Sequence, residues 1–173
     1  MELKSKIRSF PFKGVVFWDI APLLKDPKIF NDIIDALVKQ YKDKKIDVIV
    51  SNEARGFIIG APLAYALGVG FVPIRKKGKL PGGCVQLTYQ KEYEPDTIEI
   101  QQDAIKKGQK VLIIDDLLAT GGTIKANIEL VEKLGGKIVG LGFLIELDYC
   151  NPRKLIGNKY EIFSLVRYEN TNP

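Results

Sequence analysis

The sequence predicts an α/β fold with an open, mainly parallel sheet flanked by helices. Short apolar runs rich in β-branched residues alternate with segments of helical periodicity, a pattern typical of parallel strands covered on both faces. These runs are 47–50, 71–74 and 111–114, then a longer one over 137–147 and a last one over 161–166. Ligands bind beyond the carboxyl ends of the strands in such folds. We therefore expect the chemistry in the loops after Val50, Ile74 and Ile114.

Three helices are predicted around these strands. The first covers 28–41, where apolar residues recur at helical spacing after the start signal Asp26-Pro27. The second follows a loop at 51–55 and ends near Gly68, and the third covers 123–134. The chain before the first helix is irregular, and no linker or repeat divides its 173 residues. We therefore expect a single domain over 1–173.

Residues 75–95 combine lysine, glycine and proline without a sustained period. The segment is too long for an ordinary connection, which indicates a functional flap or an extended hairpin. Residues 97–100 then alternate like a strand.

The composition excludes several kinds of site. The chain has no histidine, so a Ser-His-Asp triad, a Cys-His pair and a histidine-ligated zinc site cannot exist. Lysine and arginine number 26 against 21 acidic residues, a net charge of +5. That balance favours an anionic partner, which could be a nucleic acid, a membrane surface or a phosphorylated small molecule. Charge alone does not choose among them.

The sequence carries no sign of export or of a membrane span. The first ten residues lack the apolar stretch of a signal peptide. Residues 56–74 are uncharged and approach the length of a membrane span, but prolines and glycines interrupt them. Cys84 and Cys150 lie far apart and form no CxxC pair. Two reduced thiols in a cytoplasmic protein are the expected state.

One motif, VLIIDDLLATGGT at 111–123, points to a specific ligand. The apolar run delivers Asp115 and Asp116 to the carboxyl edge of the sheet, and a glycine-rich turn then opens the next helix. Backbone N–H groups at two glycines, the helix N-terminus and the hydroxyls of Thr120 and Thr123 can hold a phosphate. Paired carboxylates repel phosphate but suit ribose hydroxyls or Mg²⁺. The whole motif therefore favours a sugar phosphate, although a capped surface turn would explain TGGT alone.

This motif resembles the signature of the type I phosphoribosyltransferases, which bind 5-phosphoribosyl-1-pyrophosphate. Further stretches resemble the members of that family that act on adenine, and the similarity covers nearly the whole chain. These stretches are FPFKGVVFWDIAPLLKDP, NEARGFIIGAPLA, VPIRKKGKLPG, EYEPDTIEIQ and IFSLVRYE. The resemblance implies the formation of AMP and pyrophosphate, with a base-recognising hood over 1–25 and a mobile catalytic flap over 76–95.

The resemblance also assigns roles to residues. Asp115 and Asp116 would hold the ribose hydroxyls, and the 5-phosphate would lie on the turn formed by Ala119, Thr120, Gly121, Gly122 and Thr123. Pyrophosphate would meet Glu53, Ala54, Arg55, Arg75 and Lys79, with a non-proline cis peptide near Glu53-Ala54. Adenine would lie against Val16, Phe17, Trp18 and Leu117. The expected catalytic residues are Glu92, Tyr93 and Arg55.

The same resemblance implies a cofactor and an assembly. Mg²⁺ would bind mainly through substrate oxygens, with Asp115 and Asp116 as possible protein ligands. A homodimer is implied, in which Arg75 reaches the partner's site. The expected partners are thus adenine, the sugar pyrophosphate and a second copy of the chain, without nucleic acid or membrane.

Three other functions compete with this interpretation. An enzyme for hypoxanthine and guanine, or for xanthine, would keep the phosphate turn and change the hood. A non-catalytic sensor of the sugar pyrophosphate would normally need a DNA-binding module, for which the chain has no spare length. An oligomerisation or RNA-binding protein could use the basic run at 75–79 alone. Each residue also has a plainer role open to it: Phe17 and Trp18 as core, Arg55 in a surface ion pair, 76–95 as a flexible hairpin.

Overall fold

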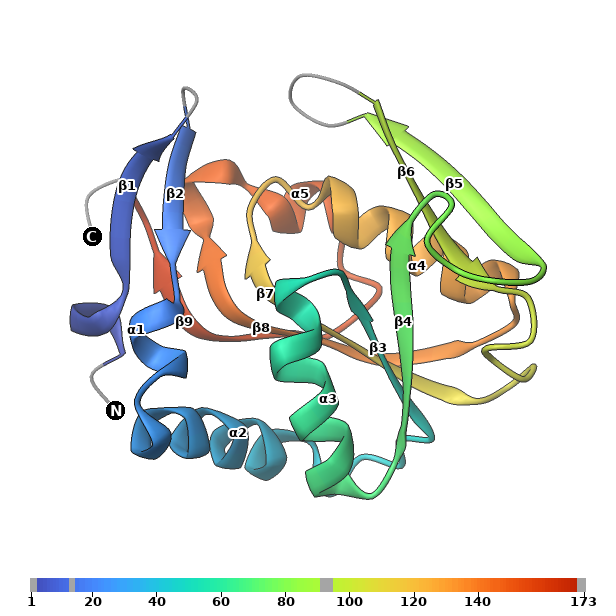
Figure 1. The fold of residues 1–173 in the computed structure, drawn as a ribbon, viewed down its shortest axis with the longest axis horizontal. Coiled ribbons are helices and arrows are strands. Elements are labelled where there is room, and N and C mark those ends of the chain that lie inside the picture. The colour runs from blue at the N-terminus through green and yellow to red at the C-terminus, as the bar shows by residue number, and fades with distance from the viewer. Residues whose placement is uncertain (1–2, 13–14, 91–94, 171–173) are drawn as a thin grey trace.

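A seven-stranded sheet forms the centre of the molecule (Figure 1). The computed structural model describes residues 3–12, 15–90 and 95–170. The strands of the sheet are β3 (Val48–Asn52), β4 (Gly70–Lys76), β5 (Cys84–Gln90), β6 (Pro95–Gln101), β7 (Lys110–Leu118), β8 (Lys137–Leu147) and β9 (Ile162–Tyr168). Their order is β5-β6-β4-β3-β7-β8-β9. Strands β4, β3, β7, β8 and β9 run parallel to one another. The predicted α/β class with a mainly parallel sheet is confirmed.

Helices cover both faces of this sheet. They are α1 (Ala21–Leu24), α2 (Pro27–Tyr41), α3 (Arg55–Leu67), α4 (Gly122–Lys133) and α5 (Pro152–Ile156), with 3₁₀ turns η1 (Lys4–Lys6) and η2 (Asp148–Cys150). Because side chains alternate along a strand, Ile114 joins the core beneath α2 and α3, while Ile113 joins the core beneath α4. The predicted start of α2 is confirmed, since the Asp26 carboxylate accepts hydrogen bonds from the Lys28 and Ile29 amides.

The chain before α1 is a hairpin, so the expectation of an irregular start was wrong. Strands β1 (Arg8–Phe12) and β2 (Val15–Asp19) pair antiparallel, and the Arg8 side chain bonds Asp19 across them. Four of the five β1 residues are exposed, and Pro11 has no backbone N–H to donate to a neighbouring strand. A strand that buries so little of either face leaves no alternating signal in the sequence.

The irregular segment 75–95 contains strand β5 and the start of β6, which pair as a second antiparallel hairpin, so the expectation of an extended hairpin is confirmed. Glu99 of β6 anchors its base by accepting hydrogen bonds from the amides of Lys79 and Leu80, at 2.9 and 3.0 Å. Figure 1 shows both hairpins flanking the carboxyl edge of the sheet. Residues 91–94, which include Glu92 and Tyr93, lie outside the described residues.

Strand β7 is longer than the apolar run predicts. It continues to Leu118, so Asp115 and Asp116 belong to the strand instead of the loop that follows it. Neighbouring β8 pairs with β7 as far as Leu118, which extends the ladder beyond the last β-branched residue. None of the helices in the described part of the chain combines the length and apolar character of a membrane span.

Candidate active site

Three loops meet at the carboxyl edge of the sheet, as the sequence predicts. The amide nitrogen of Asn52, at the end of β3, lies 3.4 Å from the Asp115 carboxylate of β7. Glu53, which follows β3, accepts a 2.6 Å hydrogen bond from the Nε of Arg75 on β4. Side chains from β3, β4 and β7 therefore converge on one place. The peptide between Glu53 and Ala54 is cis, as the resemblance implies.

Arg55, the first residue of α3, connects the sheet to the N-terminal hairpin. Its Nε lies 2.8 Å from an Asp116 carboxylate oxygen, and its Nη1 donates to the Trp18 carbonyl at 3.0 Å. Its guanidinium carbon also lies 5.0 Å from the centre of the Phe17 ring. A guanidinium offers several donors in a fixed plane, which lets one side chain serve all three partners. Arg55 therefore does more than form a surface ion pair, because it also contacts two residues of the N-terminal hairpin.

The two carboxylates are nearly buried, with 8% of Asp115 and 6% of Asp116 exposed. Burial raises the pKa of Asp115 well above its ordinary value of 3.8, and the negative charge of Asp116 raises it further. Burial also raises the pKa of Asp116, although Arg55 opposes that effect. Two carboxylates held this way form a site prepared for a ligand that offers hydroxyl donors or a cation.

Gly56 lets α3 approach Asp115 closely. A methyl group at this position would come within 2.6 Å of an Asp115 carboxylate oxygen, so any larger residue would displace that carboxylate. One turn further along α3, Gly60 covers the fully buried Ser51. Ser51 and Asn52 thus fit beneath α3 and beside Asp115.

The turn 119–123, where we expect the 5-phosphate, leads from the end of β7 into the first residues of α4. Gly121 has φ +90°, a conformation that glycine adopts without strain, and it directly precedes α4. Thr120 is exposed, and the hydroxyl of Thr123 lies 3.0 Å from the hydroxyl of Tyr89 on β5. The second hairpin therefore reaches the turn that we expect to hold the 5-phosphate.

The segment expected to bind adenine divides between core and surface. The Trp18 side chain is 1% exposed, stacks on Tyr168 at 4.0 Å between ring centres, and lies 3.4 Å from the Tyr149 hydroxyl. Its ring is therefore core, which leaves its backbone to face Arg55. Phe17 is 40% exposed, and Val16 and Leu117 pack partly buried against the core beneath α2 and α3.

The basic run 75–79 begins within β4 and is folded onto the protein. Besides Glu53, Arg75 contacts the Lys79 carbonyl, to which its Nη1 donates at 3.2 Å. These contacts hold Arg75 beside the Glu53-Ala54 loop. Its expected contact with a partner subunit stays a prediction.

The described residues contain no cluster of three or more acidic or thiol side chains that could hold a metal ion. Asp115 and Asp116 offer oxygen atoms, the ligand type that Mg²⁺ prefers. Two carboxylates are too few for an all-protein site, so they fit Mg²⁺ only if substrate oxygens complete its coordination.

Several residues at this edge have roles that sequence reasoning did not identify. Asn52 and Glu99 have no local pattern, because their partners lie 63 and 20 residues away. Tyr89 did carry a signal: Val85, Leu87 and Tyr89 alternate with polar residues, a period typical of a strand.

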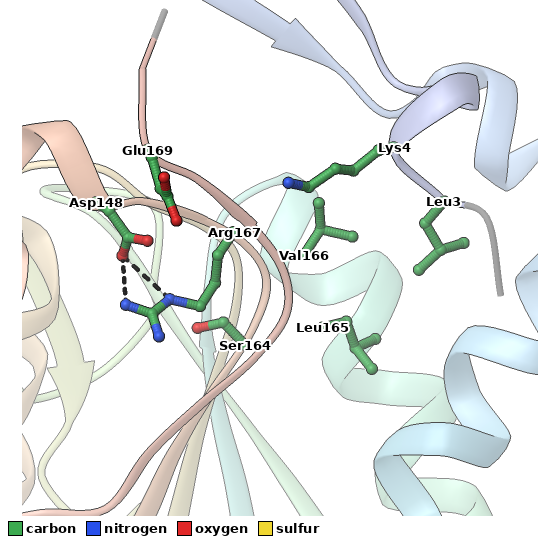
Figure 2. A pocket seen from close by; sticks show the side chains of 8 residues that line it. All are labelled: Leu3, Lys4, Asp148, Ser164, Leu165, Val166, Arg167 and Glu169. Atoms are coloured by element: carbon green, nitrogen blue, oxygen red, sulfur yellow. Dashed lines mark hydrogen bonds and ion pairs between the residues drawn. The ribbon is translucent and has the colours of Figure 1, made fainter.

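A cavity of about 580 Å³ opens along β9, whose residues Ser164 to Arg167 line it. Figure 2 shows that Lys4, Asp148 and Arg167 line it, with Arg167 pairing to Asp148. None of the residues expected to bind substrate lines this cavity.

Comparison with known proteins adds independent evidence. The family model described as "Phosphoribosyl transferase domain" matches residues 20–170. The adenine phosphoribosyltransferase of Clostridium tetani is 54% identical over 172 residues, covering 98% of this chain and 99% of the relative. That of Thermotoga neapolitana is 53% identical over 171 residues, covering 97% and 100%.

Solved structures agree with these relatives. The adenine phosphoribosyltransferase of Thermoanaerobacter pseudethanolicus has a TM-score of 0.92 and 50% identity, covering 96% of this chain and 98% of the other. The Saccharomyces cerevisiae enzyme, complexed with an imino-altritol bisphosphate and adenine, has a TM-score of 0.87 and 44% identity, covering 95% and 96%.

Proposed function

Because the chain belongs to the adenine phosphoribosyltransferases, we propose that its carboxyl-edge loops perform the reaction of that family with the residues described above. In this reaction adenine N9 bonds to C1 of 5-phosphoribosyl-1-pyrophosphate, the C1–O bond to pyrophosphate breaks, and AMP forms. The observation that carries the assignment of the site is the convergence of Arg55, Asp116 and the Trp18 backbone. It brings the sugar, pyrophosphate and base segments within contact of one side chain.

The sugar donor would bind across β3 and β7. Asp115 and Asp116 would accept hydrogen bonds from the ribose hydroxyls, and the turn 119–123 would donate backbone and hydroxyl hydrogen bonds to the 5-phosphate. Arg55, Arg75 and Lys79 would face the pyrophosphate. Cations and amides held in place before the reaction stabilise the departing negative charge without reorganisation.

Mg²⁺ fits this site when it binds together with the sugar donor. Asp115 and Asp116 are the residues that would hold it, together with oxygens of the pyrophosphate and ribose. When bound, it would supply neutralisation of the charge that develops on the leaving group.

The base would lie under the N-terminal hairpin. The exposed Phe17 ring offers a flat apolar face for a purine, and backbone groups of 16–18 offer donors and acceptors to its edge. Since the Trp18 side chain is buried, replacing it with another large apolar residue should leave the choice of base unchanged.

Glu92 is our candidate for accepting or relaying the purine proton, at N7, with Tyr93 beside it. Both residues lie outside the described part of the chain, so their roles come from the resemblance. The flap that carries them would close over the site and exclude water from the reactive sugar cation. Glu92→Leu should reduce turnover while sugar-phosphate binding stays nearly intact. Unchanged turnover would remove Glu92 from this role.

Release of pyrophosphate from the donor, measured with adenine, hypoxanthine and guanine side by side, tests the proposed function. We expect release with adenine and little with the other two bases. Release only with hypoxanthine or guanine would indicate an enzyme for another purine. Donor binding without release would indicate a sensor, and tight, salt-sensitive RNA binding without release would indicate the RNA-binding alternative.

We also propose a homodimer through the outer face of α3. Ile58 and Tyr65 lie two turns apart on this helix, and they are 40% and 90% exposed. Large apolar side chains left exposed on one face favour a partner surface. Sedimentation equilibrium should give twice the chain mass for the wild type and the chain mass for Tyr65→Glu; a monomeric wild type would exclude the dimer.

The cellular location follows the same reasoning. Neither Cys84 nor Cys150, both in the described part of the chain, forms a disulfide, which suits a reducing compartment, and we place the enzyme in the cytoplasm. Fractionation of cells from the source would test this.

A further inference from the structure

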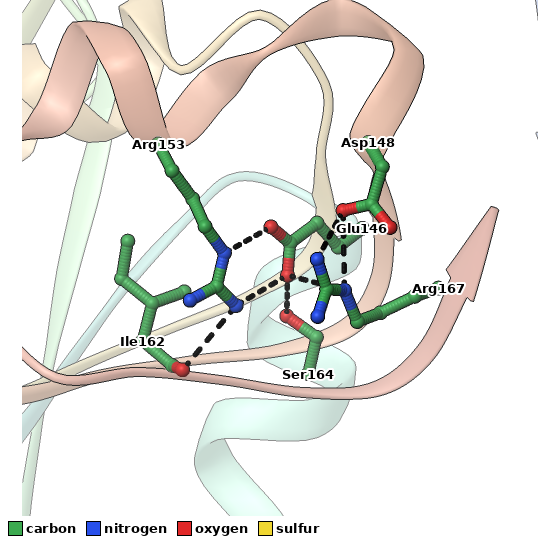
Figure 3. Close-up of polar contacts among 6 residues, drawn as sticks. All are labelled: Glu146, Asp148, Arg153, Ile162, Ser164 and Arg167. Atoms are coloured by element: carbon green, nitrogen blue, oxygen red, sulfur yellow. Dashed lines mark hydrogen bonds and ion pairs between the residues drawn. The ribbon is translucent and has the colours of Figure 1, made fainter. Parts of the chain in front are cut away.

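A fully buried carboxylate lies close behind the phosphate turn. Glu146, near the end of β8, has no exposed surface. Arg153 of α5 donates two hydrogen bonds to it, from Nε at 2.6 Å and from Nη2 at 2.8 Å, and the Ser164 hydroxyl donates a third at 2.6 Å (Figure 3). Arg167 of β9 adds a longer ion pair at 3.8 Å. Such pairing is what a buried charge requires.

Glu146 is connected to the phosphate turn in two ways. In the sheet it pairs with Leu118, the residue directly before the turn 119–123. Through Arg153 it also holds α5, and α5 touches the turn itself. A methyl group on Gly121 would come within 3.2 Å of the Pro152 carbonyl oxygen and 3.4 Å of the Ile156 side chain. The backbone at Gly121 therefore rests directly on α5.

Helix α5 has only five residues, which is too short to be stable by itself. Its position depends on what anchors it, and Arg153 lies between the two residues that touch Gly121. A bidentate arginine–carboxylate pair fixes direction as well as distance, because both partners are planar. A lysine at the same place would keep the charge and lose the second hydrogen bond.

We propose that Arg153 is a positioning residue for the 5-phosphate: paired with Glu146, it holds α5 against Gly121 and so sets the shape of the turn 119–123. The proposal rests on the proposed function, because it assigns the 5-phosphate to this turn. It assigns no contact between Arg153 and the substrate.

Arg167 provides a matched control. It also pairs with Glu146, but it lies on β9 and its closer partner is Asp148, at 2.8 Å. Arg153→Met, Arg153→Lys and Arg167→Met can therefore be compared with the wild type. The measurements are KM for the sugar donor, KM for adenine, and the midpoint of thermal unfolding.

We expect Arg153→Met to raise KM for the sugar donor roughly tenfold, because a displaced turn presents its donors poorly, while KM for adenine stays unchanged. Arg153→Lys should give an intermediate KM and remains informative if the methionine variant does not fold. Arg167→Met should leave KM for the donor unchanged.

Two results would overturn the proposal: an unchanged donor KM in a folded Arg153 variant, or an equal increase in Arg167→Met. Neither would touch the proposed function, since the wild type would still release pyrophosphate. A wild type without any turnover would instead overturn the proposed function itself.

Discussion

The hydroxyl of Tyr89 lies 3.0 Å from the hydroxyl of Thr123, joining the β5–β6 hairpin to the first turn of α4. A threonine hydroxyl has one proton. If Thr123 donates that proton to a phosphate oxygen, it can only accept from Tyr89. The tyrosine would then orient the threonine toward the ligand, and the hairpin would respond to an occupied phosphate turn.

Tyr89→Phe should therefore weaken donor binding. A hydrogen bond of this kind is worth about 0.5–1.5 kcal/mol, so KM for the sugar donor should rise by roughly two- to tenfold while KM for adenine stays constant. Steady-state kinetics with each substrate varied in turn measure both constants. An equal change in the two KM values would show that the hydroxyl does not act through Thr123.

Gly56→Ala should damage the donor site through Asp115. The added methyl group would lie 2.6 Å from the carboxylate oxygen and push it out of place, so we expect kcat/KM for the donor to fall roughly a hundredfold. Gly70→Ala is the matched control, because its nearest contact would be an ordinary 3.5 Å. Comparable losses in both variants would contradict the close approach at Gly56.

Asp115→Asn should make the protein more stable and less active. The carboxylate is buried beside Asp116, so its charge costs stability that an amide does not. The Asn52 amide can rotate to present its oxygen to the new NH₂ group. We expect a gain of about 0.5–2 kcal/mol in the free energy of unfolding at neutral pH, measured by urea denaturation. A loss of stability would show that the carboxylate contributes to the fold instead of to binding.

Glu99→Gln should change how stability depends on acid. Hydrogen bonds from the backbone amides of Leu80 and Lys79 lower the pKa of Glu99 below its ordinary value of 4.5. A lowered pKa stabilises the native state above that ordinary value, and the contribution is lost as the pH falls through the native pKa. Urea midpoints measured on the way down from neutral pH should therefore fall more steeply for the wild type below pH 4.5. Parallel curves would mean that Glu99 contributes nothing through its charge.

The sheet was predictable because its central strands have a recognisable sequence pattern. Val111 to Ile114 are apolar and β-branched, and burial on both faces requires such a run. The N-terminal hairpin was harder to predict, since β1 is mostly exposed and no apolar face marks it. Asp115 and Asp116 are buried in β7, but polar residues that follow an apolar run resemble the start of a loop, so the sequence predicts that the strand ends at Ile114.

The candidate site was predictable where ligand chemistry leaves a local motif, as at 111–123. Pairings between distant segments left none. The three partners of Arg55 come from β2 and β7, and only the fold brings them together. Glu146 and Arg153 are seven residues apart with a 3₁₀ turn between them, so the sequence alone does not indicate their contact.

The proposed function and the role of the two carboxylates are tested together by the initial rate of pyrophosphate release from 5-phosphoribosyl-1-pyrophosphate with adenine, compared between the wild type and the Asp115→Asn, Asp116→Asn double variant. We expect rapid release by the wild type and release near background by a folded double variant. No release by the wild type would exclude the proposed function, and equal rates for both proteins would exclude the role of the two carboxylates.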